Sequence, residues 1–453
     1  MFYYKKKKKS ISLTDDPIIE LFLRIAVPSS IGTIFMTLYN VVDTYFAGKI
    51  SPEALAALAQ TFPVYFIIIA LGVGLSIGTT ALIANSIGKK DFKKSAHYLS
   101  QSIIVSILTA FLVALIGINL GPEIIYMMNK NLEILKMSME YLNIIFLGSI
   151  FIFIQMSVNS ALTAKGDTIS NRNILIFSFF LNIVLNPLFI FGYGIIPAFG
   201  IKGIALSTVV SQFLGVIYII YKLYKTDITN FIKLSFFYPN IKILKDIFGQ
   251  GVPASIGMMM ISLGVFIILF FIGSFGNLAI AGYGTAVRYE QIFLLPILGL
   301  NTAVLSMVGQ NFGAKKINRI KEIYNKALII GCTFMFIFSF IIYFTAEISI
   351  LNFSKNTDVI FYGKTYLQII AFMLPIYPIF FISNALIQGL KKANIVMILS
   401  LVRMVLLPAI IFWFLIVFLN ASYEYVFWGV VIINWIFGII VFIITKYIIF
   451  RVN

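Results

Sequence analysis

Residues 27–48 read VPSSIGTIFMTLYNVVDTYFAG, an apolar stretch with one carboxylate, Asp43, close to its end. Because an α-helix rises about 1.5 Å per residue, residues 18–47 are long enough to cross the roughly 30 Å hydrocarbon core of a bilayer. A charged side chain in lipid costs about 2.5–3.5 kcal/mol on insertion scales, so it usually faces protein or a watery cavity. We therefore interpret residues 18–47 as a membrane span whose Asp43 points into a helix bundle.

The helical wheel of this span has a polar face. Thr33, Thr37, Asn40 and Thr44 form the centre of this face, and Tyr39, Met36 and Asp43 lie at its edge. A carboxylate on such a face is typical of a group that binds and releases the coupling ion of a transporter. The alternative is that Asp43 only marks the membrane interface, where a charge costs less.

The composition excludes a soluble globular domain. The 453 residues are 60% hydrophobic and 11% charged, with a mean hydropathy of +1.00. We expect twelve spans, near residues 18–47, 59–87, 97–120, 136–159, 172–192, 201–222, 247–273, 280–308, 323–345, 364–388, 394–419 and 424–447. Alternating strands of a membrane barrel do not appear, so the spans are predicted to be helices and the fold an all-α integral membrane protein.

The net charge is +17, and the basic residues are distributed according to the membrane spans and not as in a nucleic-acid-binding surface. Basic residues cluster in the loops after every second span, as in Lys89–Lys94 and Lys222–Lys245, and the Lys5–Lys9 run lies on the same side. The intervening loops carry few of them. This positive-inside pattern predicts that both termini are cytoplasmic, with no nucleic-acid partner.

Residues for metal, disulfide or acid–base chemistry are scarce. Cys332 is the only cysteine and lies in mid-span, and His97 is the only histidine. A disulfide framework, a clustered-histidine zinc site and a Ser-His-Asp triad therefore have no support. We expect neither an enzyme nor a cofactor, with an integral-membrane enzyme kept as the alternative of another class.

The second half of the chain repeats the first at one constant offset, the offset that takes Val27 to Val252. The matched segments are VPSSIG (27–32) with VPASIG (252–257), Gly88 with Gly313, and YLNII (141–145) with YLQII (366–370). Each half holds six spans, so the halves share one orientation, and such parallel repeats are related by an axis along the membrane normal. We expect two pseudo-symmetric six-helix lobes, residues 1–225 and 226–453, with the substrate cavity between them.

Two further pairs of polar residues occur on spans of the first half. They are Gln155 and Asn159, one turn apart on the fourth span, and Asn182 and Asn186, one turn apart on the fifth. Asn186 is about as far from the outer end of its span as Asp43 is from its own. We expect the two to line one cavity, with the helix loosened at Pro187.

The second half carries different polar residues. At the repeat offset Asp43 falls on Ile268, and the charges within spans include Glu290 and Arg403. Glu290 is either a second proton carrier or a structural partner of an arginine. The Met258–Met260 run suits an adaptable apolar pocket, although methionine in a membrane helix needs no such role. The lobes are therefore predicted to share a fold but not a chemistry.

Several motifs occur at particular places along the spans. They are Pro28 with YNVVDTYFAG (39–48), LIANSIGKKDFKKS (82–95), LNIVLNPLFIFG (181–192), AVRYEQIFLLPILGL (286–300) and VGQNFGA (308–314). Together with the repeat they resemble the multidrug and toxic compound extrusion (MATE) family, in particular its DinF-type bacterial branch, over nearly the whole chain. The resemblance implies export of organic, often cationic, compounds in exchange for protons or sodium, through a cleft between two lobes.

The resemblance also implies roles for single residues. Asp43 resembles the coupling carboxylate, and Pro28 resembles the proline at which the first helix bends. The implied polar surround of the carboxylate is Tyr39, Tyr141, Asn182 and Asn186. Several relatives have a second carboxylate where this chain has Asn186, which leaves one formal charge in the cavity. We therefore expect a proton rather than sodium at Asp43, with sodium as the alternative ion.

The expected substrate is a small lipophilic, often cationic molecule, transported by a monomer in the bilayer. The residues expected in its cleft are Met36, Gln155, Asn159 and Glu290. The alternative within transport is a lipid-linked saccharide flippase of the same superfamily, which would be expected to line its cavity with several cationic residues. The first-lobe cavity is instead acidic and lined by amides, so we favour export of drugs or metabolites.

Overall fold

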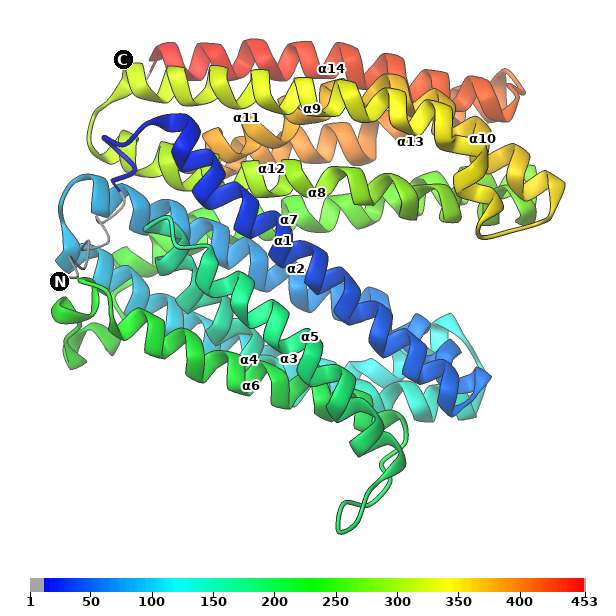
Figure 1. Cartoon of the computed structure of the whole chain (residues 1–453), viewed down its shortest axis with the longest axis horizontal. Coiled ribbons are helices and arrows are strands. Elements are labelled where there is room, and N and C mark those ends of the chain that lie inside the picture. The colour runs from blue at the N-terminus through cyan, green and yellow to red at the C-terminus, as the bar shows by residue number, and fades with distance from the viewer. Residues whose placement is uncertain (1–11, 452–453) are drawn as a thin grey trace, which may run out of the picture.

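The computed structural model describes residues 12–451, which form long helices (Figure 1). The first half contains α1 (Ile18–Ile50), α2 (Pro52–Gly88), α3 (Phe92–Met128), α4 (Leu132–Ala164), α5 (Ile169–Phe191) and α6 (Ile201–Tyr224). The link to the second half contains two short 3₁₀ helices, η1 (Thr229–Phe231) and η2 (Leu234–Phe237). The Lys5–Lys9 run lies outside the described residues.

The second half also has six spans, two of which are interrupted. Its elements are α7 (Ile241–Ile272), η3 (Gly273–Phe275), α8 (Asn277–Gly313), α9 (Ile317–Leu351), α10 (Thr357–Ile370), η4 (Ala371–Ile376), α11 (Tyr377–Gly389), α12 (Ala393–Leu401), η5 (Val402–Leu406), α13 (Leu407–Phe412), η6 (Trp413–Phe418) and α14 (Tyr423–Arg451). Pro375 lacks a backbone donor, and there the tenth span tightens into the 3₁₀ helix η4. The eleventh span contains two π-helical turns, η5 and η6. Pro375 is a sequence signal for the first interruption, whereas the apolar pattern gives no sign of the π-helical turns.

Short polar turns fix where several spans begin. The Ser51 hydroxyl accepts a hydrogen bond from the Ala54 amide at 3.0 Å, and Pro52 occupies the first position of α2. Asn131 and Asn240 accept amide hydrogen bonds in the same way at the starts of α4 and α7. Each of these caps satisfies amides that the helix leaves free.

Twelve helical segments of the described chain are long and apolar enough to cross a membrane, as the sequence predicts. They form the two six-helix lobes, and the chain is a multi-pass membrane protein. Helix α1 begins and α14 ends at one end of the molecule, which we call the termini end (Figure 1). The ribbons of the two lobes diverge from there toward the opposite end.

Glycines bring the lobes into backbone contact near the termini end. A Cβ atom on Gly88 would overlap the Gln310 carbonyl oxygen, and one on Gly313 would overlap the Asn85 carbonyl oxygen. The two contacts are the same contact exchanged between the repeats, since at the repeat offset Gly88 matches Gly313 and Asn85 matches Gln310. A second exchanged set consists of Gly74 against Ser255 and Gly299 against Ser30. The lobe boundary is therefore pseudo-symmetric.

The segment before α1 also connects the lobes at this end. Leu13 is 1% exposed, and its carbonyl oxygen accepts a hydrogen bond from Asn311 Nδ2 of α8 at 2.9 Å. Lys316 Nζ lies 2.6 Å from Asp15 Oδ1. The termini end of the molecule is closed by side-chain contacts as well as by the glycines.

Candidate functional site

Asp43 lies in a buried hydrogen-bond network inside the first lobe. Its side chain on α1 is 6% exposed, and Asn186 Nδ2 of α5 donates to Asp43 Oδ1 at 2.9 Å. Asn186 is itself fully buried and directly precedes Pro187. The carboxylate therefore faces protein, which does not fit a residue that only marks the membrane interface.

Amides and hydroxyls continue this network from α5 into α6. Asn186 Nδ2 also donates to Asn182 Oδ1 at 2.8 Å, and Asn182 Nδ2 donates to Ser207 Oγ at 3.3 Å. The Ser207 hydroxyl in turn donates to Asn186 Oδ1. Because Asn182, Asn186 and Ser207 are fully buried, a change of partner at Asp43 must alter the bonding of the other members.

Tyr39 gives α1 a second attachment, one turn before Asp43. Its hydroxyl donates to Thr208 Oγ1 of α6 at 2.9 Å, and both side chains are buried. Tyr141 of α4 is buried in the neighbouring apolar cluster, which includes Ala47, one turn beyond Asp43. Helix α1 is thus held to the first lobe by two polar contacts at the site.

The earlier part of α1 contacts the second lobe. Ser29 Oγ donates to Thr302 Oγ1 of α8 at 3.3 Å, and Ser30 packs directly on Gly299. Pro28 lies inside α1 beside these residues and removes one backbone hydrogen bond there. A single helix therefore joins the Asp43 network to the lobe boundary.

The remaining predicted cleft residues of the first lobe are not joined to this network. Gln155 and Asn159 lie on α4, and each has a buried side-chain oxygen without a partner among residues 12–451. Gln155 packs against Gly215 of α6. Met36 is 38% exposed on α1. The structure brings together Tyr39, Asp43, Asn182 and Asn186, and leaves these three residues apart.

The second lobe has a buried carboxylate of its own. Glu290 of α8 is 4% exposed, and it accepts hydrogen bonds from Tyr366 at 2.6 Å and from Tyr377 at 2.8 Å, one on each oxygen. The tyrosines come from α10 and α11, on either side of η4. Within the described chain Glu290 forms no ion pair with an arginine, the structural role that the sequence left open.

Arg403 lies nearby, in the π-helical turn η5. Its Nε donates to Asn434 Oδ1 at 2.8 Å, and its guanidinium carbon lies 3.6 Å from the ring centroid of Phe380 and 5.7 Å from that of Tyr377. Tyr377 therefore contacts both the arginine and the carboxylate. In this lobe opposite charges are linked through an aromatic ring.

Sequence reasoning missed Ser207, whose hydroxyl bonds Asn182 and Asn186 in the Asp43 network, and the two tyrosine hydroxyls that bond Glu290. Ser207 and Ser211 are one turn apart in an apolar span, the spacing that also singled out Asn182 and Asn186. Tyr366 is the repeat match of Tyr141, and this match could have indicated that Tyr366 lies near a buried carboxylate. Nothing in the sequence pointed to Tyr377.

The groups around Asp43 are neutral amides and hydroxyls. Residues 12–451 contain no cluster of three or more His, Cys, Asp or Glu side chains that could hold a metal ion. A single carboxylate in these surroundings can chemically take up a proton or a small cation, and its hydrogen-bond network includes side chains of α1, α5 and α6.

Two six-helix lobes related as parallel repeats and in contact at one end are an architecture typical of membrane transporters. The MatE family model matches residues 28–188 and 253–414, two stretches whose first residues, Pro28 and Pro253, are repeat matches of each other. The chain belongs to this family, the multidrug and toxic compound extrusion transporters. It is a transporter rather than an enzyme, as the sequence predicts.

Relatives and solved structures agree over nearly the full length. The chain is 25% identical over 415 residues to the multidrug export protein MepA of Staphylococcus aureus (strain MSSA476), which covers 91% of this chain and 88% of MepA. It is 26% identical over 406 residues to the probable multidrug resistance protein YpnP of Bacillus subtilis (strain 168), over 87% of each. A multidrug resistance MATE transporter of the MOP superfamily, solved in an outward-facing conformation, superimposes with a TM-score of 0.91 and 26% identity, over 99% of this chain and 100% of that one.

Proposed function

We propose that this protein is a proton-coupled antiporter that exports organic, often cationic, compounds across a bacterial cytoplasmic membrane. The observation that carries the proposal is the buried Asp43–Asn186 hydrogen bond of 2.9 Å, on a helix that also contacts the other lobe. The names of the relatives support multidrug efflux.

Protonation of Asp43 changes the partners of α1. An ionised carboxylate accepts a charge-assisted hydrogen bond from Asn186, and such a bond contributes roughly 1.5–3 kcal/mol. A protonated carboxyl is neutral and carries a hydrogen of its own to donate, so Asn186 turns its amide or gives up the bond. Because Asn186 is also bonded to Asn182 and Ser207, the change extends across α5 and α6.

The same helix transmits this change to the other lobe. A bound ion shifts a conformational equilibrium only by the difference in its affinity for the two states. Helix α1 carries Asp43 in its later part and the contacts of Ser29 and Ser30 with α8 in its earlier part, directly after Pro28. Proton occupancy and the position of the lobes are thereby linked, with Pro28 and Pro187 as the points of bending.

A proton suits this site better than sodium. Hard cations require several oxygen ligands. Here the side-chain oxygens of Asn182 and Asn186 already accept hydrogen bonds within the network, so Asp43 is the one charged ligand that it offers. A proton needs a single titratable group.

The substrate cleft is proposed to lie between the lobes. The side-chain oxygens of Gln155 and Asn159, which lack partners among the described residues, are acceptors for the N–H groups of a cationic substrate. Met36 supplies an adaptable apolar contact, and Glu290 a charge on the opposite lobe. Tyr141 would pack beside the coupling site, in the apolar cluster that includes Ala47.

The termini end is proposed to face the cytoplasm. Its loops carry Lys89, Lys90, Lys315, Lys391 and Lys392, as the positive-inside pattern requires. We further propose that the chain works as a monomer, with the two lobes divided near residue 225.

Transport by the purified protein in lipid vesicles tests the proposal. With an imposed inward proton gradient we expect uphill movement of a lipophilic cation such as ethidium, abolished by a protonophore. Transport that is driven equally well by sodium at constant pH, and that is insensitive to protonophore, would contradict the proton assignment.

A further inference from the structure

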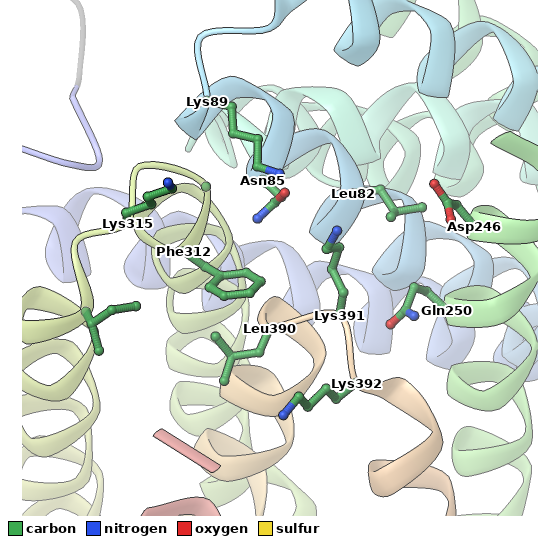
Figure 2. Close-up of a pocket in the computed structure, with 12 residues that line it drawn as sticks. Leu82, Asn85, Lys89, Asp246, Gln250, Phe312, Lys315, Leu390, Lys391 and Lys392 are labelled. Atoms are coloured by element: carbon green, nitrogen blue, oxygen red, sulfur yellow. The ribbon is translucent and has the colours of Figure 1, made fainter. Parts of the chain in front are cut away.

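A basic cavity lies at the termini end, outside the coupling site. It has a volume of about 720 Å³ and is lined by residues of both lobes (Figure 2). The first lobe contributes Asn85 and Lys89 at the end of α2, and the second contributes Lys315 after α8 together with Lys391 and Lys392 between α11 and α12. The cavity therefore exists in this form only while the lobes are in contact here.

The side chains that line the cavity carry more positive than negative charge. Four lysines line it, against one carboxylate, Asp246, which already accepts a hydrogen bond of 2.5 Å from the Tyr98 hydroxyl. None of the four lysines forms an ion pair within residues 12–451. Partial burial, and then the nearby charge of Lys89, lower the pKa of Lys391 from its usual value. Like charges in a shared recess repel one another unless an anion enters.

Asn85 provides a second, independent sign of a ligand. Its side chain is 4% exposed and lines the cavity, and its Nδ2 has no hydrogen-bond partner in the described part of the chain. A buried N–H group without a partner costs about 1–3 kcal/mol. In Figure 2 the Lys391 side chain extends from the α11–α12 turn toward the end of α2 that carries Asn85. The missing partner is an acceptor, the same chemistry that the lysines require.

Lys391 has a backbone conformation that glycine adopts at a lower energetic cost than lysine. Lys391 has φ 60, in the left-handed region, and its repeat match in the first lobe is Gly166, with φ 83. A side chain in this conformation costs roughly 1–2 kcal/mol that glycine avoids. Lys90 has the same φ of 60 at the end of α2 but does not line the cavity.

We propose that this cavity binds a phosphate-bearing anion between the lobes and so stabilises the conformation in which the termini end is closed. Ammonium groups and an amide N–H are donors only, as the oxygens of a phosphate require. The phosphate can belong to the headgroup of an anionic phospholipid or to a soluble polyphosphate. That the site is reached from the cytoplasm rests on the orientation in the proposed function.

Thermal unfolding of the full-length protein, followed by its tryptophan fluorescence, tests binding in neutral detergent. One arm adds inorganic tripolyphosphate, and the other adds phosphatidylglycerol against phosphatidylcholine as the uncharged reference. We expect one of the two anions to raise the unfolding midpoint, and excess salt to remove the effect. A response to tripolyphosphate identifies a soluble anion, and a response to phosphatidylglycerol alone identifies a headgroup. No response in either arm overturns the proposal.

Lys391→Gly and Lys90→Gly form a matched pair of variants. Both remove one charge from a left-handed position at the end of a helix, and both relax the backbone, so both are expected to fold. We expect Lys391→Gly to weaken anion affinity about tenfold, the equivalent of one charge-assisted contact, and Lys90→Gly to leave it unchanged. Equal losses in the two variants would show that only the general surface charge matters, which contradicts a built site.

A distance measurement tests the effect on the lobes. Spin labels at Lys93 and Asn318, with Cys332 replaced, lie on different lobes near the cavity. We expect the anion to increase the population with the shorter distance, and to require about a tenfold higher anion concentration for this in Lys391→Gly than in Lys90→Gly. An unchanged distance distribution would contradict stabilisation of the closed end. Since neither readout requires transport, both remain informative if proton coupling is wrong.

Discussion

The two buried carboxylates occupy different places on the same scaffold. Asp43 lies on α1, and its repeat match is Ile268, whereas Glu290 lies on α8, and its repeat match is Tyr65. Asp43 is bonded to an amide that has further amide and hydroxyl partners, whereas two tyrosine hydroxyls hold Glu290, one on each oxygen. The repeat fixes the course of the backbone and the lobe boundary, but the two lobes carry their buried carboxylates at positions that do not match.

The difference supports our proposal that Asp43, and not Glu290, exchanges the proton. An amide that is bonded to several partners passes on a change at Asp43, because it has to turn to accept a hydrogen. The tyrosines around Glu290 satisfy both oxygens, and Tyr377 also contacts Arg403. We interpret the second site as a fixed polar anchor and the first as the switch.

The largest effect is expected for Asp43→Asn. The neutral amide cannot exchange a proton, so the gradient no longer distinguishes the two conformations and uphill transport is lost. Membrane insertion should be normal, since removing a charge from a span makes its placement in lipid easier. Ethidium transport under a proton gradient, together with ethidium binding to the purified variant, measures both properties. Transport near the wild-type rate would place the switch elsewhere.

Gly88→Ala and Gly313→Ala test the lobe boundary, the region in which the two lobes make matching contacts. Each added Cβ overlaps a carbonyl oxygen of the other lobe, and overpacking of this kind costs about 1–3 kcal/mol. We expect transport to fall about tenfold, and by the same factor in both variants, since the contacts are exchanged copies. Gly249→Ala is the control, because a Cβ there meets nothing within 4 Å. Unequal effects would show that the boundary is symmetric in shape but not in energy.

Glu290→Gln should have a smaller effect on transport than Asp43→Asn. A glutamine side chain still has an oxygen for one tyrosine, and the proton site in the other lobe is untouched. We expect the rate to fall by about twofold to fivefold, with the dependence on the proton gradient retained, since one weakened contact of about 0.5–1 kcal/mol is involved. A variant that still binds ethidium but cannot be driven by protons would reverse the roles of the two lobes.

The smallest effects on transport are expected from two tyrosine substitutions that differ in stability. Tyr366→Phe removes a donor from a buried carboxylate, so the free energy of unfolding should fall by about 1.5–3 kcal/mol. Tyr39→Phe removes a bond between two neutral hydroxyls, which is worth about 0.5–1.5 kcal/mol. Denaturation in detergent, with both variants measured under one condition, checks the order. Equal losses would mean that Glu290 is not held as a charged group.

The sequence predicts the repeating architecture better than it predicts the contacts between side chains. Run length and the constant repeat offset locate the twelve spans, since a bilayer requires apolar helices of a given length. Helical spacing also places Asn182 and Asn186 on one face toward Asp43. It does not show that Tyr377 reaches Glu290, because the angle between packed helices decides this contact. The two π-helical turns of the eleventh span alter which side chains share a helix face, and the apolar sequence of that span does not predict them.

The contact of Gly88 with the Gln310 backbone, and its copy at Gly313, also bears on how this activity can be lost by mutation. Every missense change of a glycine codon introduces a Cβ atom, so at these two positions even the mildest replacement meets a carbonyl oxygen of the other lobe. Alanine and serine would be scored as conservative changes in a comparison of strains. At this boundary they would impair the transporter while leaving every polar residue of the coupling site in place.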